Sequence, residues 1–397
     1  MVCIPLWYIP YFSRSAQEDY FKNASILLLS AFVGNIWLGA FLALNLVLYI
    51  YNGSSVGYEQ VLNVVFGCVL FMLSRYYFSK NKFSDMNIPV LIITFVTTLF
   101  MAMQLWHVGW LFMPMDNGGT IESGQMSDPV GFFGIKEANG TFLTIVWPII
   151  ASINPIVALF LTIPIKLSQS SSVYIAYASV VLFYTYHLHK KVFRILLFLI
   201  PIVSTVYVIG DLKTDPKTFL SRFPIWHGSV EYAFRKPWGY GPDSYRNYTK
   251  HKDFKFLSDS QYYPAIKFRV SDSEERIEYY SPTRNQKVIK ERTERLKRDG
   301  IKKDEFAEWD NPHNAFINVL LQYGIIGLCL LLGLLTEIWR RFNSTKVDKE
   351  LVILASCLIV YFVTSLTHFP LEIARTGYLF PILLGAFYSK TDRKVNA

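Results

Sequence analysis

The stretch from Trp309 to Trp339, WDNPHNAFINVLLQYGIIGLCLLLGLLTEIW, decides the class of this protein. After the polar turn that carries His313, the run is apolar and long enough to cross a bilayer as a helix. Asn311 has the side chain of a helix N-cap, and Pro312 suits the first helical position, where its missing N–H has no partner to lose. The stretch therefore predicts a membrane-spanning helix that begins where lipid meets water.

His313 would lie in the first turn of that helix. The positive end of the helix dipole disfavours the imidazolium form there and attracts anions, which suits a neutral base beside a phosphorylated substrate. A histidine at this position can instead simply cap a membrane helix at the level of the lipid headgroups. The stretch alone leaves both interpretations open.

The composition supports a membrane assignment for the whole chain. Hydrophobic residues make up 52% of the 397 residues and charged residues only 17%, and the charges lie in blocks between long apolar runs. Such blocks indicate an integral membrane protein with several spans. The net charge of +9 requires no nucleic-acid partner, because lysines and arginines of cytoplasmic loops account for much of it.

Nine apolar runs divide the chain, and basic residues flank several of them. The basic groups at 75–82, 190–194, 340–349 and 390–394 are all expected in the cytoplasm by the positive-inside rule. Nine single crossings cannot place the first two groups on the same side. The runs are Ala24–Tyr51, Val56–Phe78, Ile88–Trp106, Thr141–Ile165, Val173–Leu188, Val192–Ile209, His313–Trp339, Leu351–Thr367 and Thr376–Tyr388.

The run Thr141–Ile165 resolves this conflict. Pro148, Asn154 and Pro164 interrupt it, so we expect a hairpin of two short helices that turns near Ser152–Pro155. The count then becomes about ten crossings with both termini in the cytoplasm. The predicted fold class is an all-α polytopic membrane protein with one large periplasmic loop domain. Its parts are residues 1–23 (cytoplasmic or interfacial), 24–210 (N-terminal bundle), 211–312 (loop domain) and 313–397 (C-terminal helices and tail).

The loop domain contains two segments rich in basic residues. Residues Asn285–Arg298, NQKVIKERTERLKR, have arginines at helical spacing and predict an amphipathic helix with a solvated face. Residues Ser221–Tyr245 interleave basic and aromatic side chains, among them Arg222, Trp226 and Arg235. Guanidinium groups suit diphosphate oxygens and tryptophan suits the face of a sugar.

Two further features of the outer segments are less specific. Gly239 and Gly241 would let the backbone approach a ligand, although most such glycines only serve turns. Lys136, Glu137 and Asn139 lie directly before the expected hairpin. Polar groups at a membrane boundary are commonly anchors.

Four motifs occur in a fixed order along the chain. They are Arg222-Phe-Pro-Ile-Trp226, Pro237-Trp-Gly239-Tyr-Gly241, His313-Asn314 and Gly324-Ile-Ile-Gly327. With this order, and with the long outer loop between the first and the last, the chain resembles the O-antigen ligase/polymerase superfamily of bacterial membrane glycosyltransferases. The resemblance covers roughly residues 130 to 388.

The resemblance implies a GT-C-like fold and an activity. Such a protein would transfer a glycan from undecaprenyl diphosphate to lipid A–core or to a growing polysaccharide, at the periplasmic face of the inner membrane. The implied reaction is inverting and uses no metal and no cofactor. His313 would be the base that activates the acceptor hydroxyl, and Arg222 would hold the diphosphate leaving group. The implied substrate-binding residues are Asn314, Trp226, Arg235, Lys166, Asn139 and Arg375.

The chain departs from the family pattern before the run that begins at Val173. Family members often carry a Ser-Arg pair there, whereas this chain reads LSQSSSV from Leu167. Lys166, Arg375 or Arg235 would then have to supply the second cation. The chain also has fewer spans than a typical member, which favours a divergent polymerase over a ligase.

Three alternatives stay open at this point. The first is a protein O-oligosaccharyltransferase of the same superfamily. The second is a polysaccharide transporter or flippase, although the apolar runs contain almost no charge, which disfavours a conduction path. The third is a structural or signalling membrane protein whose outer loop binds a partner.

Overall fold

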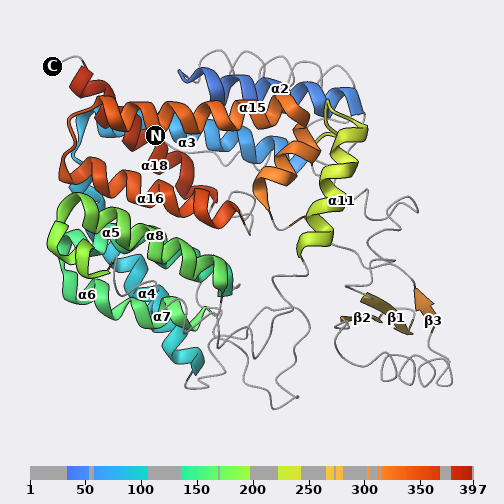
Figure 1. The fold of residues 1–397 in the computed structure, drawn as a ribbon, viewed down its shortest axis with the longest axis horizontal. Coiled ribbons are helices and arrows are strands. Elements are labelled where there is room, and N and C mark those ends of the chain that lie inside the picture. The colour runs from blue at the N-terminus through green and yellow to red at the C-terminus, as the bar shows by residue number, and fades with distance from the viewer. Residues whose placement is uncertain are drawn as a thin grey trace, which may run out of the picture.

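The described part of the chain is a helical bundle with a small three-stranded sheet (Figure 1). The sites of two predicted residues, His313 and Arg375, lie outside it, as do the segment 1–23 and the helix expected at Asn285–Arg298. The computed structural model describes residues 34–52, 58–105, 136–168, 170–196, 222–242, 265–271, 274–279, 302–304, 312, 314–366 and 377–395.

Three described helical segments are long and apolar enough to cross a membrane, namely Gln60–Lys80, Phe83–Met103 and Ala315–Ser344, and four shorter helices are also apolar. The helices begin and end close to the apolar runs. They are α2 (Ile36–Asn52), α3 (Tyr58–Lys80), α4 (Asn87–Leu105), α5 (Lys136–Ile153), α6 (Pro155–Phe160), α7 (Thr162–Leu167), α8 (Ser171–Leu188), α11 (Arg222–Arg235), α15 (Ala315–Ser344), α16 (Lys349–Ser365) and α18 (Leu379–Val395), with a short 3-10 helix, η2 (Phe83–Met86).

The predicted turn within Thr141–Ile165 is confirmed, but the arm after it consists of two short helices, α6 and α7, where the prediction had one. Asn154 ends α5 and caps α6, because its side chain accepts hydrogen bonds from the N–H groups of Ile156 and Val157. Pro155 occupies the first helical position of α6, where a backbone N–H would have no partner within the helix, so its absence costs nothing. The indole N–H of Trp147 donates to the carbonyl of Ala158 over 3.0 Å, so the returning arm packs against α5.

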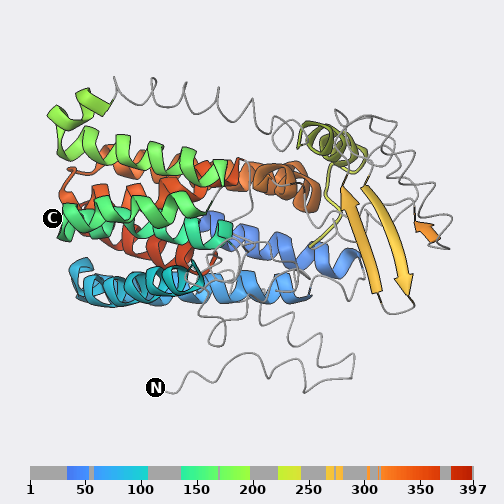
Figure 2. The same cartoon turned by 90° about the horizontal axis from the view of Figure 1, so that it is seen from below.

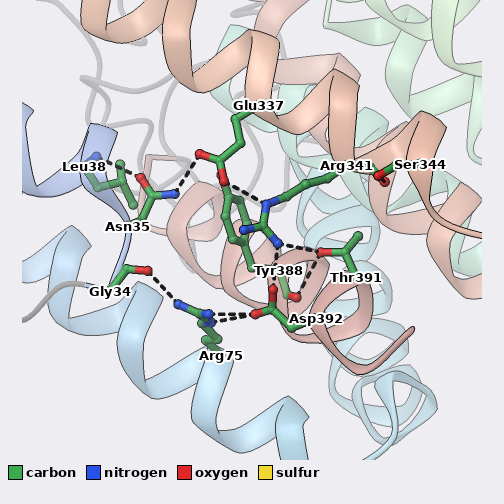
Figure 3. A network of polar contacts seen from close by, with 10 residues as sticks. All are labelled: Gly34, Asn35, Leu38, Arg75, Glu337, Arg341, Ser344, Tyr388, Thr391 and Asp392. Carbon is green, nitrogen blue, oxygen red and sulfur yellow. Dashed lines mark hydrogen bonds and ion pairs between the residues drawn. The ribbon is translucent and has the colours of Figure 1, made fainter. Parts of the chain in front are cut away.

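A network of ion pairs joins four helices at one end of the bundle, which we call the basic end (Figure 3). Asp392 of α18 accepts hydrogen bonds from Arg75 of α3 at 2.7 Å and from Arg341 of α15 at 2.6 Å. Glu337 accepts one from Arg341 at 2.8 Å and one from Asn35, beside α2, at 3.3 Å. The two arginines and two carboxylates balance in charge.

Further contacts bring the other basic groups to the same end. Lys390 pairs with Asp348 and Glu350 at the start of α16. Lys349 donates to the carbonyl of Ser152 at the hairpin turn over 2.9 Å. The ring of His187, near the end of α8, lies 5.3 Å from that of Phe342, which follows Arg341. The four basic groups therefore share one end of the bundle, as the hairpin requires.

Helix α16 lies at the centre of the bundle and is buried on almost all sides. Its residues Leu351, Leu354 and Tyr361 are fully buried, and it packs against α5, α8 and α18. Helix α4 instead exposes Ile88, Ile92, Phe95 and Leu99, whose spacing puts them on one face. An exposed apolar stripe of this kind is typical of a lipid-facing helix.

The loop contains a sheet that the all-α fold class did not include (Figure 2). Strand β1 (Ala265–Ser271) pairs antiparallel with both β2 (Glu274–Tyr279) and β3 (Lys302–Asp304). The signal was present in AIKFRVS, where apolar and polar residues alternate as in a strand. It was missed because the surrounding charge density suggested a solvated segment.

The close contact of α3 with α18 gives a stability test at two glycines. A Cβ on Gly385 would lie 2.6 Å from the carbonyl oxygen of Phe71, whereas one on Gly67 would meet only a Pro381 side-chain carbon at 3.9 Å. Gly385→Ala should lower the melting temperature, because backbone atoms cannot yield to the new methyl. Gly67→Ala should leave it equal or higher, since alanine favours a helix by about 0.5–1 kcal/mol.

The measurement is thermal unfolding of the purified full-length chain in detergent. Equal melting temperatures for the two variants would contradict the observed packing of α3 on α18.

Candidate functional site

Two of the predicted motifs meet at the end of the bundle opposite the basic end, which we call the motif end. The indole N–H of Trp226, in α11, donates a hydrogen bond of 2.9 Å to the carbonyl of Pro312. Arg222 is the first residue of α11, one helical turn before Trp226, and Pro312 directly precedes His313. The helix that opens with Arg222 is therefore joined to the turn that carries His313.

Helix α15 is broken at Gly324, where φ is 66° and ψ is −165°. The segment Pro237–Gly241 fills this break with three backbone hydrogen bonds. The N–H groups of Tyr240 and Gly241 donate to the carbonyls of Leu321 and Gln322 at 3.0 and 2.8 Å, and the N–H of Ile325 donates to the carbonyl of Pro237 at 2.9 Å. We call this contact the glycine junction.

The glycine junction explains why both motifs need glycine. A Cβ on Gly239, whose φ is 92°, would lie 2.4 Å from the carbonyl oxygen of Gln322. A Cβ on Gly324 would lie 2.1 Å from the carbonyl oxygen of Pro237. These glycines thus let two backbones touch, and the ligand contact suggested for Gly239 is replaced by a contact within the protein.

A row of amide side chains runs along α15 from the motif end to the glycine junction. Asn314 donates to the carbonyl of Leu366 at 2.8 Å. Gln322 donates to Asn318 at 3.1 Å and accepts from Gln60 of α3 at 2.8 Å. The sequence analysis missed Asn318 and Gln322, although a spacing of four residues places all three amides of α15 on one face.

The position of the helix cap differs from the sequence prediction. Asn314, not Asn311, is the N-cap of α15, because its side chain accepts from the N–H of Ile317 at 3.1 Å. The helix accordingly begins at Ala315, two residues beyond His313. Both polar ends of the Asn314 amide are thereby engaged within the protein, which makes it a positioning residue rather than a ready ligand for substrate.

Arg235 does not share the face of α11 that carries Trp226. It follows Trp226 by about two and a half turns, so the two residues lie on opposite faces of the helix. Its side chain is exposed and pairs with Glu231 at 2.9 Å. This hydrogen bond raises the pKa of the guanidinium above its usual value. The prediction that Arg235 binds the same substrate as Trp226 is therefore not supported by its placement.

Asn139 and Lys166 lie on the hairpin side of the bundle. Asn139 is fully buried between α4 and α5, with its amide nitrogen 2.6 Å from the sulfur of Met101. Its carbonyl oxygen has no hydrogen-bond partner within the described part of the chain. Lys166 is exposed near the end of α7. Of these two, only Lys166 has a side chain that is exposed at the surface.

Comparisons with known proteins do not assign the chain to a family. No protein-family model matches it, and no curated protein is significantly similar to it. Its function is therefore argued from its motifs and from the contacts between them.

The glycine junction predicts the effect of a single methyl group. Gly324→Ala should destabilise the motif end by about 1–3 kcal/mol or more, because alanine is strained at this φ and its Cβ meets a backbone oxygen. Hydrogen exchange of the Tyr240 and Gly241 amides should accelerate. Gly67→Ala is the matched control and should leave that exchange unchanged. Unaltered exchange in Gly324→Ala would contradict the junction.

Proposed function

We propose that this protein is a membrane glycosyltransferase of the O-antigen ligase/polymerase type. It would have a GT-C-like fold of about ten crossings in the bacterial inner membrane, with residues 211–312 as a periplasmic loop domain. The observation that carries the proposal is the hydrogen bond from Trp226 to Pro312. This bond joins the segment that carries Arg222, which is proposed to bind the diphosphate, to the segment that carries His313, the proposed base.

The proposed reaction is a direct displacement at the anomeric carbon of the donor sugar. His313 takes the proton of the acceptor hydroxyl, and the acceptor oxygen forms the new glycosidic bond. The bond from the anomeric carbon to the diphosphate oxygen breaks, and the configuration inverts. Arg222 compensates the charge that develops on the leaving undecaprenyl diphosphate, so no metal is required.

The contacts on either side of His313 support a positioned base. The carbonyl of Pro312 is held by Trp226, and the side chain of Asn314 is held by Leu366 and Ile317. Both chain neighbours of His313 are therefore anchored to other helices or to the helix that follows. Fixed geometry of this kind is what a base needs in order to meet an acceptor hydroxyl.

The proposed roles predict that His313→Ala and Arg222→Ala each abolish glycan transfer. Loss of a general base lowers a rate by about 10²–10⁴-fold, and loss of the leaving-group cation acts on the same step. Each variant is expressed in a deletion strain, its membrane insertion is checked, and surface polysaccharide is examined on a gel. Retained transfer in either variant would defeat the proposed chemistry.

The same gel distinguishes the members of the superfamily. Loss of the whole ladder in the deletion strain indicates a ligase, and collapse to a single repeat indicates a polymerase. A mass shift of an exported protein would indicate a protein O-oligosaccharyltransferase. An unchanged polysaccharide profile, with no such shift, would favour a partner-binding protein.

The hydrogen bond of Trp226 predicts a graded effect. Trp226→Phe keeps an aromatic ring but removes the donor to Pro312, and a neutral hydrogen bond contributes about 0.5–1.5 kcal/mol. Transfer should fall by about tenfold, because the turn before His313 loses its anchor. The matched control is Trp339→Phe, since Trp339 is largely exposed and lies at the basic end, between Glu337 and Arg341. Equal rates for the two variants would show that the Trp226 contact does not serve the reaction.

A further inference from the structure

Helix α11 lies across the motif end of the bundle. Figure 1 shows α11 running nearly perpendicular to α2 and to the longer part of α15, which follows the break at Gly324. Figure 2 shows α11 end-on. The apolar helix α2 ends at Asn52, within reach of the turn that follows α11. A helix that crosses the ends of membrane helices in this way lies parallel to the membrane surface.

Helix α11 and the turn that follows it carry large exposed aromatic residues. Phe234 is 62% exposed and Trp238 is 68% exposed. Tyr51, near the end of α2, is 77% exposed. Aromatic side chains are enriched at the level of lipid headgroups, where their rings contact both lipid and water.

Two cations lie near tyrosine rings of the same region. The ammonium of Lys236 is 5.8 Å from the centre of the Tyr51 ring and 5.2 Å from that of Tyr240. The guanidinium of Arg235 is 5.6 Å from the Tyr232 ring. Glu231 pairs with Arg235, so these two cations and this carboxylate together carry one net positive charge.

We propose that this surface, made by Tyr51, Phe234, Arg235, Lys236 and Trp238, binds the phosphate headgroups of anionic phospholipids in the outer leaflet. The cations complement the phosphates, and the aromatic rings enter the interface beside them. A basic side chain near an anionic membrane changes an equilibrium by about fivefold. We call this surface the headgroup patch.

The two faces of α11 argue for phospholipid rather than the lipid-linked donor. Trp226 faces the turn that carries His313, whereas Arg235 lies on the opposite face of the helix. A diphosphate held at Arg235 would therefore be turned away from the proposed base. The headgroup patch does not depend on the proposed reaction, but its place in the outer leaflet rests on the membrane orientation given in the proposed function.

The test uses the full-length chain in nanodiscs of phosphatidylcholine, with or without phosphatidylglycerol. Hydrogen exchange of the α11 amides from Glu231 to Arg235 should be about fivefold slower with phosphatidylglycerol. The double variant Arg235→Gln/Lys236→Gln should lose this difference. Lys190→Gln, an exposed lysine at the basic end, is the matched control and should keep it.

Three outcomes would overturn the proposal. Equal exchange in the two lipids would show that the patch does not sense anionic headgroups. Persistence of the difference in the double variant would assign the effect to other residues. Protection only when undecaprenyl phosphate is added to phosphatidylcholine would make the patch a donor site. Melting temperatures of the variants identify any loss of folding, and Lys236→Gln alone then replaces the double variant.

Discussion

The three backbone hydrogen bonds of the glycine junction are the constraint on which the motif end depends. A membrane helix that breaks at Gly324 leaves carbonyl and N–H groups without helical partners, and each such group costs several kcal/mol in lipid. Residues Pro237–Gly241 supply the missing partners. The segment that follows α11 is thereby fixed to the interior of the long apolar helix α15, and the two glycine motifs become parts of one structure.

The orientation of α11 follows from this junction. The segment that follows α11 is held at Gly324 of α15. Trp226, near the start of α11, bonds to Pro312, shortly before α15 begins. Helix α11 and the part of α15 before Gly324 are therefore connected at both of their ends. The amides of Asn318 and Gln322 satisfy one another within α15, and Gln60 extends the contact to α3. Both chain neighbours of His313, Pro312 and Asn314, therefore make hydrogen bonds within the protein.

Local signals predicted the described helices of the bundle, but they did not predict the contacts between distant segments. The positions of the apolar helices follow from the length of the apolar runs. The turn after α5 follows from Asn154 and its neighbouring prolines, and the common end of the basic groups follows from their places between the runs. The cap was misplaced because both Asn311 and Asn314 have the right side chain, and only the bond to Ile317 separates them. Arg235 was grouped with Trp226 because proximity in sequence hides the opposite faces of a helix. The partner of the glycine motif lies too far along the chain for any pattern to name it.

Ion pairs connect the helices at the basic end, whereas the described contacts around α15 at the motif end are uncharged. This difference bears on the proposed chemistry. At the basic end, Arg75 and Arg341 form ion pairs with Asp392 and Glu337, and these pairs hold helices together. The described contacts that build the motif end around α15 use backbone groups, amides and an indole, none of which is ionised. A carboxylate beside Arg222 would compete with a diphosphate for the same guanidinium. In the proposed reaction, uncharged contacts of this kind would not compete with the leaving group for Arg222, whose charge would lower the energy of the transition state.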